Sequence, residues 1–305
     1  MQQKRETLVA IFLFTLVILG NAVVFAIVPR LTIPEYGHGL HAFQVMLCYS
    51  AIATLCMLPW AARQGLKGLK TTRMKTYSLR AVLEYGAFTL SFYSLGYLGD
   101  LFTLPMHTAL NFITPLLATI VTIFVLKEKG YAHTWIALAI GFLGVLIITR
   151  PGMIPASPGV AFVLAAALGF SFCGVVIKLL TRTESPNHIA FYMLAMTTIL
   201  ALPAGILNWK TPTTEGWGWL ALIGVIAFLQ QVLVAKAIAK VPFMVLIPLN
   251  FLQLLFATIL SYAVYDKLID GWTLVGALVI LAGTLYNTYR NHTQAGKEAV
   301  QAGVV

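Results

Sequence analysis

The stretch LNFITPLLATIVTIFVLKE, from Leu110 to Glu128, recurs 139 residues later as LNFLQLLFATILSYAVYDK, from Leu249 to Lys267. The two stretches align without a gap. Both contain Leu-Asn-Phe followed, six residues further on, by Ala-Thr-Ile. Apolar helices often resemble one another by chance, so the Asn-Phe and Ala-Thr-Ile identities carry most of the weight. We interpret the pair as an internal repeat, which divides the chain into two halves.

The composition is that of a membrane protein. Of 305 residues, 59% are hydrophobic and 10% are charged, and the mean hydropathy is +0.87. Soluble proteins carry about 25% charged residues. The three cysteines lie in apolar runs without metal-ligand spacing, which favours neither a disulfide framework nor a metal site. We therefore expect a multi-pass protein of the cell (inner) membrane.

Ten segments are candidates for membrane spans, since a helix needs about 20 apolar residues to cross the bilayer. The predicted fold is an all-α integral membrane protein, and its last residues, 291–305, are small and polar and are expected to form a disordered cytoplasmic tail. The predicted spans are residues 8–28, 40–60, 79–98, 101–126, 134–149, 159–180, 189–207, 217–237, 242–265 and 272–289.

Ten spans place both termini on one side of the membrane. If that side is the cytoplasm, all but four of the 20 lysines and arginines lie there, as the positive-inside rule requires. The net charge of +10 is then a topology signal, and we expect no nucleic-acid partner. The densest basic cluster, from Arg63 to Arg80, either anchors this topology or contacts anionic lipid headgroups.

The repeat predicts two five-helix domains, residues 1–152 and 153–290. Because five is odd, the two halves must be inserted in opposite orientations. Asn111 and Asn250 should then approach the middle of the membrane from opposite sides. Inverted repeats with a binding site at the midplane are typical of secondary transporters.

Polar side chains within the spans mark the candidate substrate site, because such residues usually face a cavity or a partner. His107, Asn111 and Thr114 share one helix face. The alternatives are hydrogen bonding between helices for the polar residues and ordinary packing for the aromatic ones. The candidates are Asn21, Phe88, Phe92, His107, Asn111, Thr114, Gln230, Asn250 and Gln253.

Glu84 is the only carboxylate well within a predicted span. A buried carboxylate is the usual proton acceptor of a proton-coupled transporter, which makes Glu84 the coupling candidate. Alternatively it pairs with Arg80, one helical turn earlier. Pro115 and Pro248, close to the two repeated asparagines, either open their helices or are ordinary membrane prolines.

Spans five and ten contain small residues and no intramembrane charge. Gly141 and Gly144 lie in the first, and Gly276 and Gly283 in the second. Small residues let membrane helices approach closely. We predict that these two spans pack as a scaffold, away from the transport path.

Four short motifs agree with the pattern of a known family: Asn-Phe-x-x-Pro-Leu from Asn111, the charged turn Lys127-Glu128, Gly141-x-x-Gly144, and Thr149-Arg150-Pro151-Gly152. With ten spans in two repeats, they resemble the EamA-like branch of the drug/metabolite transporter superfamily. The resemblance implies a basket of spans one to four and six to nine around a central cavity, with spans five and ten to one side. Leu19-Gly20 departs from the Trp-Gly pair that is frequent in span one. Lys267 likewise departs from the acidic residue expected opposite Glu128.

We expect a secondary active transporter that moves a small polar or amphipathic metabolite by alternating access, as an exporter or exchanger. The alternative is an importer or exchanger of a nutrient such as an amino acid or a nucleoside-like cofactor. An intramembrane enzyme is less favoured, because the spans contain no HExxH motif, no GxSxG motif and no acidic dyad. The sequence also has no P-loop, so ATP drive would have to come from another chain. A channel is also less favoured. The expected partners are the substrate, the bilayer, and a proton or counter-substrate, with no cofactor or metal. The sequence leaves open whether the chain is a monomer or a homodimer.

Overall fold

The computed structural model describes residues 2–36, 38–97, 103–126, 132–150, 157–180, 183–240 and 247–301. Over these residues the chain is helical and contains no strand. Short 3-10 helices are marked η. The elements in chain order are α1 (Gln2–Thr32), η1 (Pro34–Tyr36), α2 (Ala42–Gly68), α3 (Met74–Leu95), α4 (Leu104–Asn111), α5 (Thr114–Leu126), α6 (Ala132–Thr149), α7 (Pro158–Leu180), α8 (Pro186–Leu207), α9 (Thr214–Lys240), η2 (Ile247–Asn250), α11 (Phe251–Tyr265) and α12 (Gly271–Gln301).

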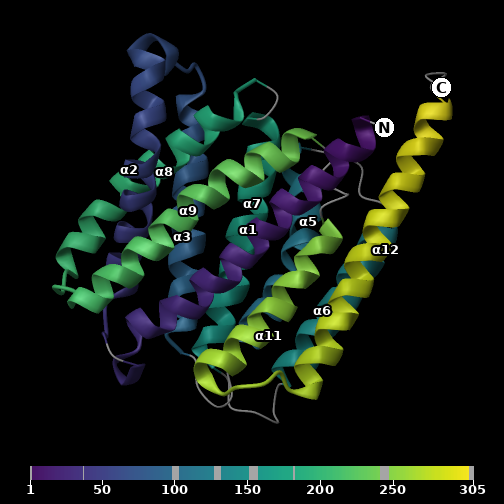
Figure 1. Ribbon diagram of the computed structural model, residues 1–305. Helices are drawn as coiled ribbons and strands as arrows, with labels where there is room; N and C mark the ends of the chain where they lie inside the picture. Colours follow the sequence, from purple (N-terminus) through teal and green to yellow (C-terminus); the bar gives the residue numbers. More distant parts are fainter. Residues whose placement is uncertain are drawn as a thin grey trace.

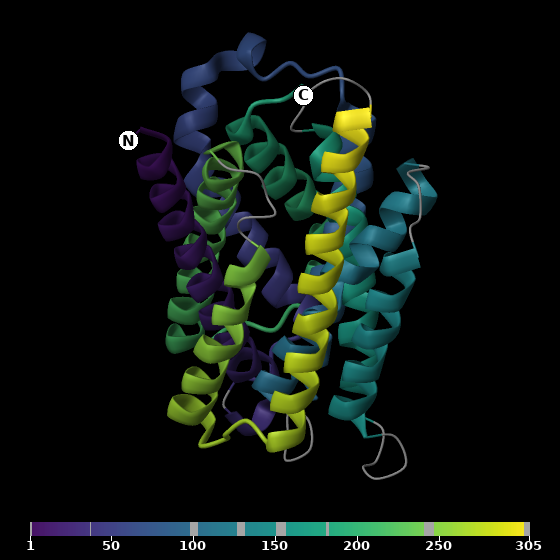
Figure 2. The same ribbon diagram turned by 90° about the vertical axis from the view of Figure 1, so that its right-hand side faces the viewer.

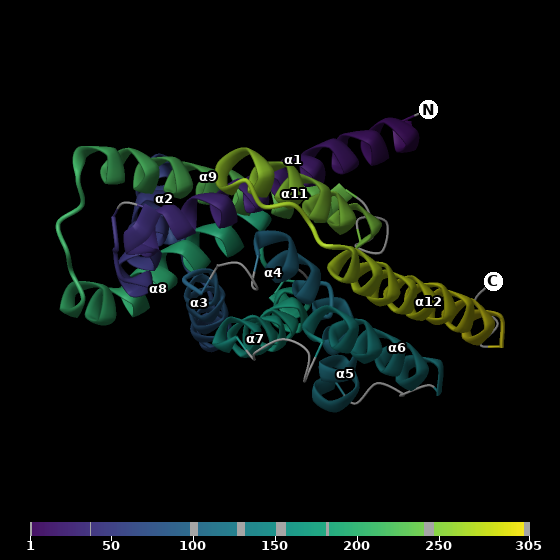
Figure 3. The same cartoon turned by 90° about the horizontal axis from the view of Figure 1, so that it is seen from below.

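The helices form one bundle, with α6 and α12 at one edge and α2 and α8 at the opposite edge (Figure 1 and Figure 3). The start of α1 and the end of α12 lie at the same end of the bundle (Figure 1 and Figure 2). We call this end the terminal end and the other the distal end. Termini on one side agree with an even number of crossings. That this side is the cytoplasm remains a prediction.

Six of the described helices are long and apolar enough to cross a membrane, namely α1, α2, α6, α7, α8 and α9. The remaining predicted spans fall on α3, on α4 with α5, on η2 with α11, and on α12. Shorter apolar stretches cover Leu252–Tyr265 and Gly271–Asn287 in the last two. The chain is therefore a multi-pass membrane protein, and the count of ten spans remains a prediction.

The structure differs from expectation at the tail and in the fourth predicted span. Residues 291–301, expected to be disordered, continue α12 as helix to Gln301. They include alanine, glutamine, lysine and glutamate, which favour helix, and extending an existing helix avoids the cost of nucleation. The fourth predicted span is two helices, α4 and α5, separated at Phe112 and Ile113.

The helix contacts have the same pattern in both halves of the chain. Helix α1 packs along α9, and α3 packs along α7. Helix α2 packs against α8, α6 against α12, α1 against α11, and α7 against α5. Exchanging each helix of residues 1–152 with its counterpart in residues 153–290 maps these pairings onto one another. An internal repeat predicts this pattern, whereas the domain boundary and the inverted insertion remain predictions.

Glycines bring α6 and α12 into close contact. A Cβ atom on Gly144 would lie 2.7 Å from the carbonyl oxygen of Gly276, and one on Gly276 would lie 2.6 Å from that of Gly144. A Cβ on Gly283 would lie 3.3 Å from the nitrogen of Gly141. Gly141 also faces α5, where a Cβ would lie 2.2 Å from Leu116 Cδ1. At Gly144, Gly276 and Gly283, a larger residue would meet the backbone of the facing helix, so it cannot fit without separating α6 from α12.

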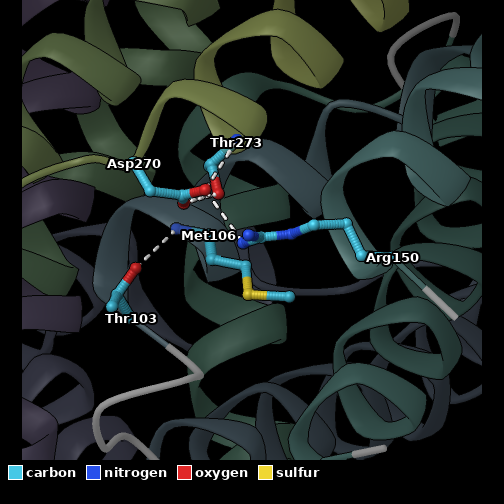
Figure 4. Close-up of polar contacts among 5 residues, drawn as sticks. All are labelled: Thr103, Met106, Arg150, Asp270 and Thr273. Carbon is cyan, nitrogen blue, oxygen red and sulfur yellow. Dashed lines mark hydrogen bonds and ion pairs between the residues drawn. The ribbon is translucent and has the colours of Figure 1, made fainter. Parts of the chain in front are cut away.

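Polar contacts hold the same two helices together at the distal end (Figure 4). The Nη2 atom of Arg150, at the end of α6, lies 2.8 Å from Oδ2 of Asp270. Asp270 directly precedes α12 and accepts hydrogen bonds from the hydroxyl and the backbone N–H of Thr273, as an N-cap residue does. Nearby, Thr103 caps α4 by accepting from the N–H of Met106 at 3.4 Å. These contacts fix where α4 and α12 begin.

Candidate functional site

A cavity of about 410 Å³ lies inside the bundle, between helices of both halves. This is within the range of about 300–1,000 Å³ that is usual for small-molecule sites. Its polar lining residues are Asn21, Arg80, Glu84, Asn111, Thr114, Gln230, Gln231, Asn250, Gln253 and Thr284. Its aromatic lining residues are Phe25, Tyr49, Phe88, Phe112 and Phe170.

The cavity brings together seven of the nine side chains predicted for the substrate site, together with Glu84. They come from α1, α3, α9 and the two repeated stretches, which are far apart in the sequence. The seven are Asn21, Phe88, Asn111, Thr114, Gln230, Asn250 and Gln253.

Asn111 lines the cavity at the point where the first repeated stretch breaks. At the end of α4 the hydrogen bonding changes to the 3-10 pattern, since the N–H of Phe112 donates to the carbonyl of Ala109, three residues earlier, at 3.1 Å. A continuous helix would need a bond from residue 115 to the carbonyl of Asn111, and Pro115 has no N–H to donate. Helix α4 therefore ends at Asn111, and α5 begins at Thr114.

Asn250 occupies the corresponding position in the second half. It is the last residue of η2, and α11 begins at the next residue, Phe251. Pro248 lies within η2. Asn111 thus lies at a helix break and Asn250 at the junction of a 3-10 helix with an α-helix, and both line the same cavity. Irregular backbone at membrane depth is tolerated where it lines a cavity, and transporters place such breaks at their binding sites.

His107 and Phe92 lie behind the cavity wall instead of on its surface. His107 is fully buried, with Nε2 3.1 Å from the Ser91 hydroxyl and its ring 5.0 Å edge-on from Phe25. Phe92 is also fully buried and packs against Tyr49. The predicted stripe of His107, Asn111 and Thr114 assumed one continuous helix. The helix breaks after Asn111, yet Asn111 and Thr114, on either side of the break, both line the cavity. His107 differs from them because it is buried against Ser91.

Asn21 and Gln230 join α1 to α9 at the cavity wall. The side-chain N–H of Gln230 donates to Asn21 Oδ1 at 2.7 Å and to the Val17 carbonyl at 3.1 Å. These residues line the cavity and also form hydrogen bonds between helices, whereas their role in binding a substrate remains a prediction.

Glu84 is held by two neighbours. Its Oε2 lies 3.3 Å from Arg80 Nη2, and its Oε1 accepts a hydrogen bond from Gln231 Nε2 at 3.0 Å. The pairing with Arg80 that the sequence offered as an alternative is therefore present. Proton coupling through Glu84 remains a prediction.

Several lining residues were not among the predicted site residues. Thr284 belongs to α12, so this predicted scaffold helix contributes one side chain to the cavity. Gln231 follows Gln230, and neighbouring helix positions point about 100° apart, so sequence spacing did not indicate that both would line the cavity. Phe25, Tyr49 and Phe170 are aromatic residues among many, and no local signal distinguishes them from core residues.

Over the described residues, a helical membrane bundle with a polar cavity lined by Asn111 and Asn250, one from each repeated stretch, has the form of a transporter for small molecules. Residues 157–289 match the model of the EamA-like transporter family. The chain is 27% identical over 262 residues to an S-adenosylmethionine uptake transporter of Rickettsia bellii, covering 86% of this chain and 89% of the relative. It is 27% identical over 253 residues to a riboflavin transporter of Vibrio cholerae, covering 82% and 84%.

Two matches at lower sequence identity are a further transporter and a solved structure with the same fold. A pseudopaline exporter of Pseudomonas aeruginosa is 23% identical over 255 residues, covering 83% of this chain and 88% of the relative. A solved crystal structure at 14% identity shares the fold, with a TM-score of 0.61 over 96% of this chain and 98% of the other. These matches support membership of the drug/metabolite transporter superfamily, and the matched relatives are named as transporters of small metabolites.

Proposed function

We propose that this chain is a secondary active transporter that moves a small amphipathic metabolite by alternating access through the described cavity. One observation carries the proposal: Asn111, at a helix break, and Asn250, at the junction of η2 with α11, come one from each half and line the same cavity. A site shared by two halves can be exposed to either side of the membrane when one half tilts against the other.

The shape of the bundle supports one conformation of such a cycle. On α7 and α9 the lining residues lie in the half of each helix nearest the terminal end. At the distal end, a layer of aromatic residues lies between the helices. The Tyr93 hydroxyl is hydrogen-bonded to His41 Nε2 at 2.9 Å, and the Tyr93 ring packs against Phe43 and Phe162. We propose that the cavity is reached from the terminal end in this state, and that loosening the aromatic layer opens the opposite state.

The lining suits a substrate that has both a flat ring and polar groups. On one wall of the cavity, the rings of Phe88 and Phe170 pack edge to face with their centroids 5.0 Å apart. Amide side chains from the repeated stretches line another part of the cavity. Relatives named for S-adenosylmethionine uptake and for riboflavin make a nucleoside-like cofactor the substrate class that we propose. This favours the nutrient alternative over export.

We propose exchange as the mode of transport, since it requires no titrating group and Glu84 is already held by Arg80 and Gln231. Net export is the second candidate direction, because one relative is named as an exporter. The inner membrane is the expected location.

Counterflow tests the proposal. Proteoliposomes loaded with unlabelled S-adenosylmethionine should accumulate the labelled compound from outside, whereas empty or protein-free liposomes should not. Riboflavin, adenosine and several amino acids form the competitor panel. Accumulation that is unchanged by a pH gradient supports exchange, and accumulation that follows the gradient supports proton coupling. If no solute in the panel shows counterflow, the proposed function is wrong.

A further inference from the structure

Arg80 and Glu84 are the only charged residues in the described lining of the cavity. Each residue is 6% exposed, so both charges are removed from water. They lie one turn apart on α3, and Glu84 is bonded across the cavity wall to Gln231 of α9.

The two groups do not satisfy one another. Nε and Nη1 of Arg80 have no hydrogen-bond partner among the described residues. Glu84 Oε2 lies 3.3 Å from Arg80 Nη2 but makes no well-aligned hydrogen bond there. A guanidinium carries five N–H donors, and leaving buried donors unused is unfavourable.

Stability alone explains this pair poorly. A buried ion pair gains little over apolar residues of similar size, because both charges must be desolvated. Within a helix, an acidic residue stabilises best when it precedes the basic one, and here Arg80 precedes Glu84. The unused donors thus point to a ligand that completes the pair.

We propose that Arg80 and Glu84 bind the zwitterionic head of an α-amino acid, either free or as part of a larger metabolite. The substrate carboxylate accepts hydrogen bonds from Arg80, and the substrate ammonium donates to Glu84, which Gln231 holds in place. Phe88 lies one turn beyond Glu84 and lines the cavity, so the rest of the substrate extends along the aromatic wall. This inference rests on the proposed transport function and names the part of the substrate that is recognised.

Other groups in the cavity fit this assignment. The second half presents Gln230, Gln231, Asn250 and Gln253 to the cavity, which are polar and uncharged. They can bind the polar groups of a larger metabolite but supply no charge. An ionic head group is therefore matched only by the first half, among the residues that the structure describes.

The test compares head groups on purified protein. Binding is measured by thermal shift and by competition against labelled S-adenosylmethionine, with methionine, its decarboxylated amine, its deaminated acid and methylthioadenosine as probes. The amine and the acid should each bind at least about tenfold more weakly than methionine, because each loses a charge-assisted hydrogen bond. Tighter binding of S-adenosylmethionine than of methionine identifies a larger metabolite, and the reverse identifies a free amino acid.

Two variants assign the groups. In Glu84→Gln, the preference for methionine over its deaminated acid should disappear while binding of the acid stays within about twofold. In Arg80→Gln, the preference for methionine over its amine should disappear, and Arg80→Lys should restore part of it. Glu35→Gln, an exposed carboxylate in η1, is the control and should behave as wild type.

The inference is overturned if wild-type protein binds methylthioadenosine as tightly as S-adenosylmethionine, or methionine no better than its amine and its acid. It is also overturned if both variants weaken every probe equally. Thermal shift needs no transport, so a protein that discriminates head groups but shows no counterflow would contradict the proposed transport and leave this inference standing.

Discussion

Asn111 shows how one residue serves both the backbone and the cavity. Its side-chain N–H donates to the His107 carbonyl at 3.1 Å, within α4, while the residue itself lines the cavity. This hydrogen bond within the helix orients the amide.

We expect Asn111→Ala to lower the apparent affinity for the transported solute about two- to tenfold, since a hydrogen bond contributes about 0.5–1.5 kcal/mol. Counterflow over a range of substrate concentrations measures this change. Asn208→Ala, at an exposed position after α8, is the matched control and should leave transport unchanged. An unchanged affinity in Asn111→Ala would remove this residue from the site.

At the residue scale, the predicted amides line the cavity, whereas His107 is not among the described lining residues. Amide side chains are expensive to leave without partners in a membrane, so their presence in a span already indicates a cavity or a contact. Whether the partner is a ligand or a neighbouring helix depends on what lies opposite. For His107 that neighbour is Ser91, which no spacing rule within the fourth predicted span could reveal.

At the scale of elements, the break between α4 and α5 follows from a property of Pro115 that the sequence contains, its missing N–H. The sequence left open whether the proline opened the helix, because a membrane helix can also kink gently around proline. The structure shows a separation of two residues, Phe112 and Ile113.

Pro115→Ala tests the importance of this break. With the N–H restored, α4 and α5 can join, and amides 112–114 should exchange hydrogen more slowly than in wild type. Transport should fall, because the backbone at Asn111 turns away from the cavity. Pro203→Ala, a proline inside α8 outside the described cavity lining, is the control. Full transport with slowed exchange would show that the break is not required.

Helices α6 and α12 illustrate an element-scale prediction made from small residues. Gly144→Leu should reduce the yield of folded protein, because overpacking a close contact costs about 1–3 kcal/mol and the Cβ alone would lie 2.5 Å from Ile280 Cγ1. Gly218→Leu, in α9 with nothing within 4 Å of its Cβ, is the matched control. Thermal stability and yield in detergent are the measurements. Normal yield with selective loss of transport would contradict a scaffold role for Gly144.

At the scale of the whole molecule, the pairing of helices across the halves creates the cavity. Neither half encloses it alone, since α3 packs along α7 and α1 along α9. A cavity at such an interface changes its exposure when the halves move, which a cysteine reporter can detect.

Cys173 lines the cavity, whereas Cys48 and Cys56 do not appear in its described lining. In a variant that retains only Cys173, a membrane-impermeant maleimide should react from the side of the termini, and a transported solute should slow the reaction. A variant that retains only Cys56 is the control, and the solute should not change its rate. Equal labelling of Cys173 with and without any transported solute would argue against occupancy of this cavity.

The sequence by itself determined the class of fold, the repeat and the set of polar residues from which the site is drawn. These are local properties, because the bilayer requires apolar helices whose backbone is satisfied internally, and each polar exception is visible in the sequence. The two repeated stretches were predicted to supply Asn111 and Asn250, and both line the cavity. Only the tertiary structure decided which other side chains join them. Glu84 and Gln231, 147 residues apart, meet because α3 and α9 present particular faces to the cavity, and the rotation of each helix is set by packing against its neighbours.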